Sequence, residues 1–191
     1  MSTILTISGS PSASARTGVL VSYVNARLVE AGHEVHTVQV RQLPTLPLLT
    51  EDLNDPQIAE AVTRILNADG IVVASPVYRA AYSGLVKALL DLLPKRALRG
   101  RAVLPLATGG SQGFLVAMDY ALNPLLAGKG ADHVVRGEFV LDNRIRPELG
   151  DNALDPEAAL AVLAATERFT AALADVGYRR RRGTGHLRPA V

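Results

Sequence analysis

The chain has no cysteine and no tryptophan, and its 191 residues include only four histidines. Without cysteine it can form neither a disulfide nor a thiolate metal site, and it cannot use a thiol nucleophile. The histidines do not show the HExxH spacing of zinc enzymes, so we predict no metal centre. The lack of cysteine also fits a reducing compartment, and we expect a cytoplasmic protein.

Long apolar runs are absent as well. No stretch approaches the ~20 consecutive apolar residues that are needed to cross a bilayer. The first ten residues are neither basic at their start nor long enough for a secretory signal peptide, so we expect none. With 48% hydrophobic and 20% charged residues, the chain has enough apolar material for the core of one globular domain.

The net charge of +2 is unevenly distributed along the chain. The last thirteen residues, RRRRGTGHLRPAV, contain five arginines and no acid, so the remainder is net negative. These residues include no aromatic side chain to stack on bases and no apolar face for a membrane surface, so we predict binding to neither nucleic acid nor membrane. We expect one domain over residues 1–177, followed by a basic, disordered tail over residues 178–191.

Strand-like and helix-like segments alternate along the chain. Apolar or alternating runs predict five strands, at 3–8, 34–40, 71–74, 102–108 and 133–141. Helical spacing of apolar residues predicts five helices, at 17–31, 56–67, 83–93, 113–127 and 155–177. A proline-rich loop is expected over 42–53. This α/β alternation implies a doubly wound parallel sheet.

Pro105 lies within the predicted fourth strand. A central strand that contains proline loses one hydrogen-bond donor of its ladder. We therefore expect a local bulge in that strand.

Three polar or glycine-containing loops follow predicted strands, and in a parallel sheet such loops gather at one edge. The first, GSPSASARTG over residues 9–18, combines hydroxyl groups, one arginine and the start of a helix. These groups suit a terminal phosphate dianion. The loop matches neither GxGxxG nor GxxxxGK[ST], which disfavours a dinucleotide Rossmann site and a P-loop. A plain capped turn is the alternative.

The second and third loops suit a flat aromatic ring. The second, SPVYRAAYSG, offers Pro76 and Val77 as an apolar wall, and the third, TGG at 108–110, has glycines where a backbone can approach a ligand closely. An isoalloxazine ring needs apolar contact on its faces and backbone N–H and carbonyl groups along its edge. Together the three loops predict a site for flavin mononucleotide, FMN.

The stretches ADGIVVASPVYRAAYSGLVKALLDLLPKRAL and VLPLATGG resemble the NADPH-dependent FMN reductases of the alkanesulfonate-utilisation system. The resemblance runs from Ile4 to about Val140. It implies a flavodoxin-like fold whose five parallel strands are ordered 2-1-3-4-5. It also implies hydride transfer from NADPH to FMN, with NADH as the alternative donor, and a partner monooxygenase that uses the reduced flavin to cleave carbon–sulfur bonds.

The resemblance assigns site residues in each loop. The FMN phosphate would be bound by residues of the first loop, namely Ser10, Arg16, Thr17 and Gly18. The ring would be bordered by residues of the second loop, namely Pro76, Val77, Tyr78 and Arg79. The far edge of the ring would meet residues of the third loop, namely Thr108, Gly109, Gly110 and Ser111. Arg79 stands where close relatives carry lysine, which keeps the charge but changes the hydrogen-bond geometry.

The segment Asp119-Tyr120-Ala121-Leu122 resembles a helix in which these reductases carry an inserted tyrosine, which forms a π-bulge at a tetramer interface. The surrounding helix, 113–127, is apolar almost all round, which suggests burial against another subunit. We therefore expect a homodimer or homotetramer with Tyr120 at the interface. The alternative is that Tyr120 is an ordinary packing residue of a regular helix.

Hydride transfer between stacked rings needs no side-chain acid or base, so we assign no catalytic residue. Arg16 and Arg79 are candidates for contacts to a pyridine-nucleotide phosphate. Two other flavin functions fit this fold: an FMN-retaining quinone, azo-dye or chromate reductase, and a flavodoxin-like electron carrier. The pI of about 9.1 and the 4% aromatic content disfavour the carrier. A non-enzymatic binding module is the third alternative.

Overall fold

The computed structural model describes residues 1–183, apart from the side chains of residues 151 and 179–183. The strands of its parallel sheet are β1 (Thr3–Ser8), β2 (Glu34–Gln39), β3 (Gly70–Tyr78), β5 (Ala102–Gly109), β6 (His133–Val134) and β7 (Glu138–Leu141). The main helices are α1 (Arg16–Glu30), α3 (Pro56–Asn67), α4 (Gly84–Asp91), α5 (Asn123–Gly128) and α6 (Pro156–Gly183). Strands and helices alternate as the sequence predicts.

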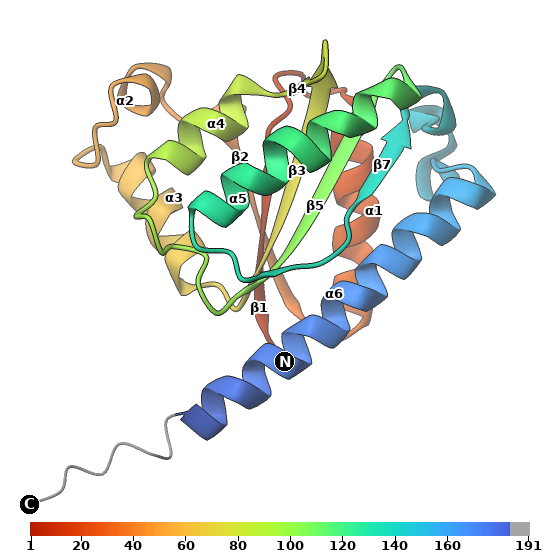
Figure 1. The fold of residues 1–191 in the computed structure, drawn as a ribbon. Coiled ribbons are helices and arrows are strands. Elements are labelled where there is room, and N and C mark those ends of the chain that lie inside the picture. The colour runs from red at the N-terminus through yellow and green to blue at the C-terminus, as the bar shows by residue number, and fades with distance from the viewer. Residues whose placement is uncertain (184–191) are drawn as a thin grey trace, which may run out of the picture.

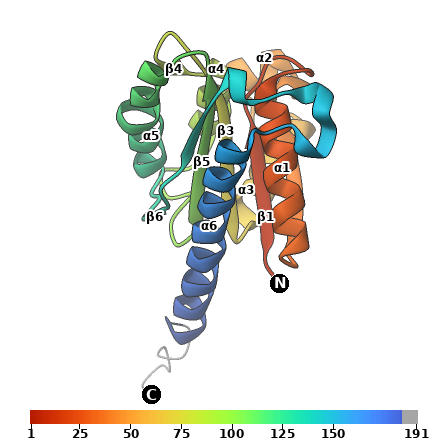
Figure 2. The same cartoon turned by 90° about the vertical axis from the view of Figure 1, so that its right-hand side faces the viewer.

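The sheet has the order β2-β1-β3-β5, and β6 and β7 both pair in parallel with the outer side of β5. This is the predicted flavodoxin-like order, with the fifth strand in two pieces. Helices α1 and α6 cover one face of the sheet, and α3, α4 and α5 cover the other (Figures 1 and 2). No helix of the described part of the chain is long and apolar enough to span a membrane.

Each face of the sheet carries its own core, because side chains alternate between the two faces along a strand. Ile4 and Val72 pack with the apolar face of α1 and with Phe169 of α6. Their neighbours Leu5 and Ile71 point the other way, into a second core with α3, α4 and the end of α5. The near-continuous apolar runs of the sequence therefore reflect burial on both faces.

Local signals set several helix starts. Asp55 caps α3 by accepting hydrogen bonds from the backbone N–H groups of Gln57 and Ile58, at 2.9 and 3.1 Å, and Pro56 occupies the first turn. Asp155 accepts a bond of 2.8 Å from the N–H of Ala158 at the start of α6. Both starts agree with the prediction.

Pro105 is accommodated differently from the prediction. Val103 accepts a hydrogen bond from the N–H of Val135, so the backbone groups of residues 103 and 105 are directed toward the β6–β7 side. At Pro105 that partner is interrupted between Val134 and Glu138. The missing donor therefore faces a gap in the partner strand, and no bulge in β5 is needed.

Four further segments differ from the sequence-based boundaries. The loop 42–53 contains a short helix, α2 (Thr45–Leu49), and β3 runs on to Tyr78 instead of ending at Ala74. A hairpin follows, in which β4 (Ala81–Tyr82) pairs antiparallel with the end of β3. The predicted helix 113–127 is divided, and α6 continues to Gly183 past the expected end at residue 177. The remaining residues of the predicted tail, 184–191, lie outside the described residues.

The divided helix consists of a 3₁₀ turn, η2 (Gln112–Leu115), a π-helix, η3 (Met118–Leu122), and α5. The N–H of Asn123 donates to the carbonyl of Met118, five residues earlier. Pro124 has no N–H to offer the carbonyl of Tyr120, so the α-helical ladder is broken at this position. The predicted π-bulge at Tyr120 is thus confirmed as backbone geometry.

Candidate functional site

The carboxyl ends of β1, β3 and β5 lie side by side at one edge of the sheet. Ser8 pairs with Ala74, and Pro76 pairs with Thr108. The predicted phosphate loop and the two predicted ring loops therefore extend from the same edge, where the β3–β4 hairpin projects (Figure 1). This arrangement brings the three groups of predicted site residues together.

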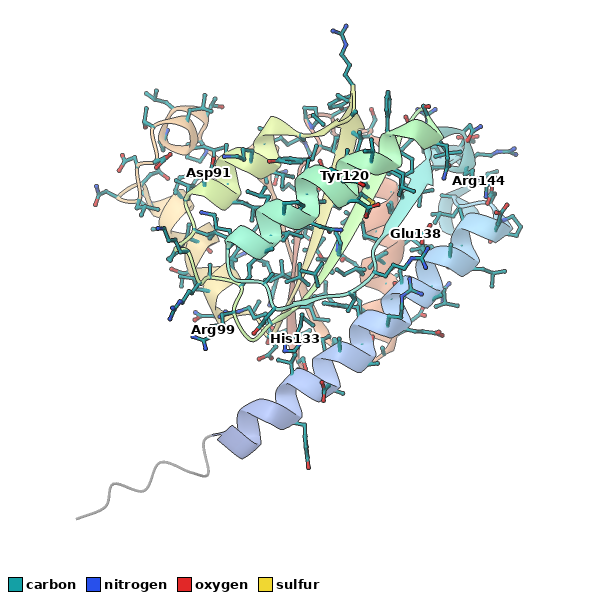
Figure 3. All side chains as sticks on the ribbon, in the orientation of Figure 1. Asp91, Arg99, Tyr120, His133, Glu138 and Arg144 are labelled. Atoms are coloured by element: carbon teal, nitrogen blue, oxygen red, sulfur yellow. The ribbon has the colours of Figure 1, made fainter. Side chains whose placement is uncertain are left out.

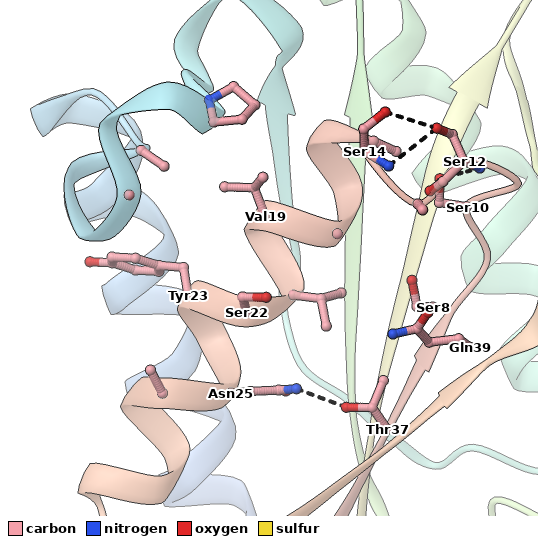
Figure 4. Close-up of a pocket in the computed structure, with 18 of the residues that line it drawn as sticks. Ser8, Ser10, Ser12, Ser14, Val19, Ser22, Tyr23, Asn25, Thr37 and Gln39 are labelled. Carbon is pink, nitrogen blue, oxygen red and sulfur yellow. Dashed lines mark hydrogen bonds between the residues drawn. The ribbon is translucent and has the colours of Figure 1, made fainter.

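The first loop is held tightly at its base and is rich in hydroxyl contacts beyond it. The N–H of Gly9 donates to the carbonyl of Ala74 at 2.9 Å, and a Cβ on Gly9 would lie 2.1 Å from Val86 Cγ2. Ser10 is buried, and its hydroxyl both donates to the carbonyl of Ser12 and accepts from the Ser12 N–H, at 3.2 and 3.3 Å. The loop is therefore shaped by its own hydrogen bonds (Figure 4).

The N-terminus of α1 is open to an anion. Its N-cap position is Ala15, and no side chain of the described residues caps the helix. The N–H groups of Gly18 and Val19 already bond to the Ala15 carbonyl, which leaves those of Arg16 and Thr17 pointing out of the helix end. Arg16 is exposed at this turn and forms no ion pair with a described residue.

A buried hydrogen bond joins the first and third loops. The hydroxyl oxygens of Thr17 and Thr108 are 2.6 Å apart, and both residues are buried. Because these two residues belong to α1 and β5, the bond fixes the separation of the predicted phosphate site from the predicted far edge of the ring. Both residues are predicted site residues, but the sequence alone does not predict that they contact each other.

The second loop is shorter than the sequence suggests, because its first residues belong to a strand. Pro76 and Val77 lie within β3 and are buried, Val77 with Phe139 and Met118, and their contact with a ring stays a prediction. Of the four predicted site residues of this loop, Tyr78, at 56%, and Arg79 are exposed.

The hairpin after β3 is stabilised by its turn and by one serine. Arg79 and Ala80 turn the chain with φ values of 49° and 62°. The buried Ser75 hydroxyl accepts from the N–H of Ser83 at 2.8 Å and donates to the carbonyl of Pro76. Ser75 thus positions the hairpin, a role that its single hydroxyl in an apolar run could have suggested.

The third loop contains two glycines with different roles. A Cβ on Gly109 would lie 2.9 Å from the Phe139 ring, so this buried position requires glycine for packing. A Cβ on Gly110 would meet nothing closer than Asp142 Oδ2 at 3.9 Å, and Gly110 and Ser111 are exposed. The backbone at 110–111 is therefore accessible to a ligand, as predicted from the sequence.

Titratable groups with shifted pKa values lie away from these loops. Burial lowers the pKa of the His33 imidazole, and burial raises the pKa of the Glu138 carboxyl against the attraction of Arg168 and Arg136. Within the described residues there is no group of three or more His, Asp or Glu that could hold a metal ion. The geometry supports binding and orientation of a ligand, without an acid–base pair at the site.

A cavity of about 790 Å³ begins at the first loop and runs along α1 toward β2 (Figure 4). Ser10, Ser12 and Gly18 line its upper end. The predicted ring-binding residues of the second and third loops do not line it. The cavity is therefore a neighbour of the predicted flavin site and does not coincide with it.

Tyr120 lies in the π-helix η3 and is 81% exposed, in the segment that crosses in front of the sheet in Figure 3. Leu115 and Val116 of the same segment are 40% and 42% exposed. The expected apolar surface is thus present on the single chain. Its burial in a dimer or tetramer stays a prediction.

Comparisons with known proteins agree with this description. The model of the family described as NADPH-dependent FMN reductase matches residues 2–145. An FMN reductase (NADPH) of Pseudomonas putida is 42% identical over 142 residues, which is 74% of this chain and 72% of that protein. An FMN reductase (NADPH) of Escherichia coli is 39% identical over 154 residues, 78% of this chain and 81% of that protein.

A solved structure of similar fold is the apo form of the NADH:FMN oxidoreductase EMOB. It is 39% identical to this chain, with a TM-score of 0.81 and coverage of 88% of each chain.

Proposed function

The chain belongs to the NADPH-dependent FMN reductase family, and from this premise we propose that its three loops bind FMN and that the reduced flavin is passed to a partner monooxygenase. The chain is an oxidoreductase that uses NAD(P)H to reduce FMN. The observation that carries the assignment of the site is the buried Thr17–Thr108 hydrogen bond, which holds two of the three loops together.

The first loop fits the phosphate group of FMN. The open N-terminus of α1 provides unpaired N–H groups and the positive end of the helix dipole. Arg16 adds a cation that forms no ion pair in the described part of the chain, and the Ser10 hydroxyl lies at the base of the loop. A phosphate dianion would satisfy these donors together, as Ser10, Arg16, Thr17 and Gly18 were predicted to do.

The other two loops fit the ring. Tyr78 and Arg79 stand exposed at the β3–β4 hairpin, and the backbone of Gly110 and Ser111 is accessible across from them. Pro76, Val77, Thr108 and Gly109 are buried, so they would contribute backbone groups and shape in place of exposed side chains. Arg79 is a second cation available to a nucleotide phosphate.

Bound FMN supplies the hydride acceptor, and the nicotinamide supplies the hydride. The side chains then have three tasks: to hold the flavin, to leave one face of its site open to a second ring, and to limit the access of water. No side-chain acid or base is required, and none with a shifted pKa lies at these loops. The rigid bases of the first and second loops, set by the Gly9 and Ser75 hydrogen bonds, favour a fixed orientation of the ligand.

The partner and pathway are the finer part of the proposal. The motifs PVY, AYSG and LPLATGG resemble reductases of the alkanesulfonate-utilisation system, which supports delivery of reduced FMN to a monooxygenase that cleaves carbon–sulfur bonds. The nucleotide donor is NADPH, with NADH as the alternative.

Steady-state kinetics test this proposal. The purified protein is expected to oxidise NADPH only when free FMN is added and to support turnover of a flavin-dependent sulfonate monooxygenase. Yellow protein that retains FMN through gel filtration and passes electrons to a quinone or azo dye would instead indicate an FMN-retaining reductase. Absence of NAD(P)H oxidation with added FMN would contradict the activity itself.

A further inference from the structure

A polar cleft lies between α1 and β2, within the large cavity described above. Its walls are formed by Ser22 and Asn25 of α1 and by Thr37 and Gln39 of β2 (Figure 4). Arg41, which follows β2, also lines it. Contacts between a helix and a sheet are normally apolar, because they bury the core face of each element. On the opposite side of β2, Val38 does pack into the apolar core. The polar side therefore needs a separate explanation.

The floor of the cleft is satisfied by protein groups. The Thr6 hydroxyl donates to Asn25 Oδ1 at 2.7 Å, and Asn25 Nδ2 donates to the Thr37 hydroxyl at 2.9 Å. This chain of bonds fixes the Asn25 side chain and leaves its polar neighbours nearer the sheet edge to face the cavity. The cleft is thus a built feature with a rigid base.

Two groups above the floor lack partners. Gln39 Oε1 is buried and accepts no hydrogen bond from a described residue. The Arg41 guanidinium forms no ion pair or side-chain hydrogen bond within the described part of the chain. A buried acceptor without a donor costs free energy, so a ligand hydroxyl would be favoured there. An unpaired arginine beside it favours a phosphate group.

The position of these groups in the fold limits the class of ligand that the cleft can bind. Gln39 and Ala74 both pair with Ser8, one from each side, so the cleft lies two strand spacings, about 10 Å, from Ala74 in the middle of β3. In doubly wound dinucleotide-binding folds, a residue about 20 positions after the phosphate-binding first turn contacts the adenosine ribose, and an arginine nearby accommodates a 2′-phosphate. The first loop here lacks the glycine fingerprint of those folds, but Gln39 and Arg41 follow its last residue, Gly18, by about the same spacing.

We propose that this cleft binds the adenosine 2′-phosphate end of NADPH. Arg41 would contact the phosphate, and Gln39 Oε1 would accept a hydrogen bond from a ribose hydroxyl. The inference rests on the proposed function, because the nicotinamide end would reach the flavin site past the first loop. Arg41 is then a specificity-determining residue that favours NADPH over NADH.

Kinetics with both nucleotides at saturating FMN test the proposal. Arg41→Ala is expected to raise KM for NADPH by about tenfold or more, the loss expected for a charged hydrogen bond, and to leave KM for NADH within about twofold. Gln39→Glu is nearly isosteric and places a carboxylate beside the phosphate. It should raise KM for NADPH while sparing NADH, since a carboxylate can accept from a ribose 2′-hydroxyl.

Arg99→Ala is the matched control, because Arg99 is exposed just before β5, at the opposite edge of the sheet (Figure 3), and does not line the cleft. It should change neither KM. Equal changes for NADPH and NADH in the Arg41 variant, or no change in either, would overturn the proposal. Unaltered FMN affinity and far-UV circular dichroism would establish that the variants are folded.

FAD also carries an adenosine with a phosphate group, so the cleft could bind the adenosine end of FAD in place of that of NADPH. A binding experiment distinguishes these two ligands. If Arg41→Ala weakens the binding of FAD relative to that of FMN and leaves the ratio of the KM values for NADPH and NADH unchanged, the cleft binds the adenosine end of a flavin. The proposal is then wrong. Direct binding of adenosine 2′,5′-bisphosphate to the FMN-saturated protein, lost in Arg41→Ala, would support it. That readout does not require turnover, so failure of the proposed reductase activity is recognised separately.

Discussion

The side-chain hydroxyls of Thr17 and Thr108 are 2.6 Å apart and buried, although 91 residues separate them in the chain. The bond connects the first turn of α1 to the end of β5. The bond therefore links the predicted phosphate loop to the predicted far edge of the flavin ring. We expect a substitution that breaks it to lower both the free energy of unfolding and the affinity for flavin.

Thr17→Val keeps the shape of the side chain but leaves the Thr108 hydroxyl buried without its partner. We expect a loss of about 1–3 kcal/mol in the free energy of unfolding, measured by urea denaturation, together with weaker FMN binding. The double variant with Thr108→Val should lose less than the sum of the two single variants, because it removes both polar groups. Strict additivity would contradict a direct bond.

Gly137 lies against Pro105 where the partner strand of β5 is interrupted. A Cβ at residue 137 would lie 2.0 Å from the Pro105 carbonyl oxygen and 2.8 Å from Met118 Cε. We expect Gly137→Ala to lower the free energy of unfolding by about 3 kcal/mol or more, since a backbone atom cannot move aside cheaply. Gly128→Ala, which has no atom within 4 Å of the new Cβ, should stay within about 0.5 kcal/mol. Equal stability of the two variants would contradict the close approach.

The sequence predicts the layers of this fold well because the strands are buried on both faces and the helices carry strong local signals. The apolar run at Ile71–Ala74 and the capping pair Asp55-Pro56 suffice for a strand and a helix start. The end of β3 is less predictable, because Ser75 and Pro76 continue the strand by pairing with Ala107 and Thr108 of β5, a contact far away in the sequence.

The site is predicted only in part, for a related reason. Residues that follow strands can be placed at one sheet edge from topology alone, which brings Arg16, Arg79 and Gly110 together. Burial depends on the whole fold, so the covered position of Val77 could not be foreseen. Polar residues within elements, such as Asn25 and Gln39, have no local signal that distinguishes a cleft from a solvated surface.

Arg16→Ala tests the phosphate loop. Arg16 is exposed at the open N-terminus of α1, and loss of a charged hydrogen bond to a dianion should weaken FMN binding by about 1–3 kcal/mol. Titration of flavin fluorescence measures this change. Arg99→Ala, at the opposite edge of the sheet in Figure 3, removes the same charge far from the loop and should bind FMN as before. An unchanged dissociation constant in Arg16→Ala would remove this residue from the site.

His33 makes the stability of the fold depend on pH. Both of its ring nitrogens are buried and have no hydrogen-bond partner among the described residues, and burial lowers the imidazole pKa from 6.5, with the N-terminal ammonium adding to the effect. Because the folded pKa is below the unfolded value, the unfolded chain binds more protons as pH falls below about 6.5, and stability is lost there. Urea denaturation from about pH 8 to about pH 5 should show a steeper loss for wild type than for His33→Leu. Parallel curves would contradict this assignment.

Tyr120 tests the link between the π-helix and assembly. The Asn123 N–H donates to the Met118 carbonyl, so η3 holds one residue more than an α-helical turn would. Deleting Tyr120 should restore α-helical bonding and rotate the preceding segment by about 100° relative to α5. The exposed Tyr120, Leu115 and Val116 would then no longer form the same surface. We expect a dimer or tetramer for wild type by light scattering, and a smaller assembly for the deletion variant.

The binding and reduction of FMN should change in the same variant, because η2 follows directly on the Gly110–Ser111 backbone at the predicted edge of the ring. We expect the variant to retain FMN more firmly through gel filtration and to lose steady-state NADPH oxidation with free FMN. Tyr120→Phe keeps the inserted residue and should preserve both assembly and turnover, which separates the backbone geometry from the hydroxyl group. A deletion variant with wild-type assembly and turnover would mean that the π-helix serves only local packing around Pro124.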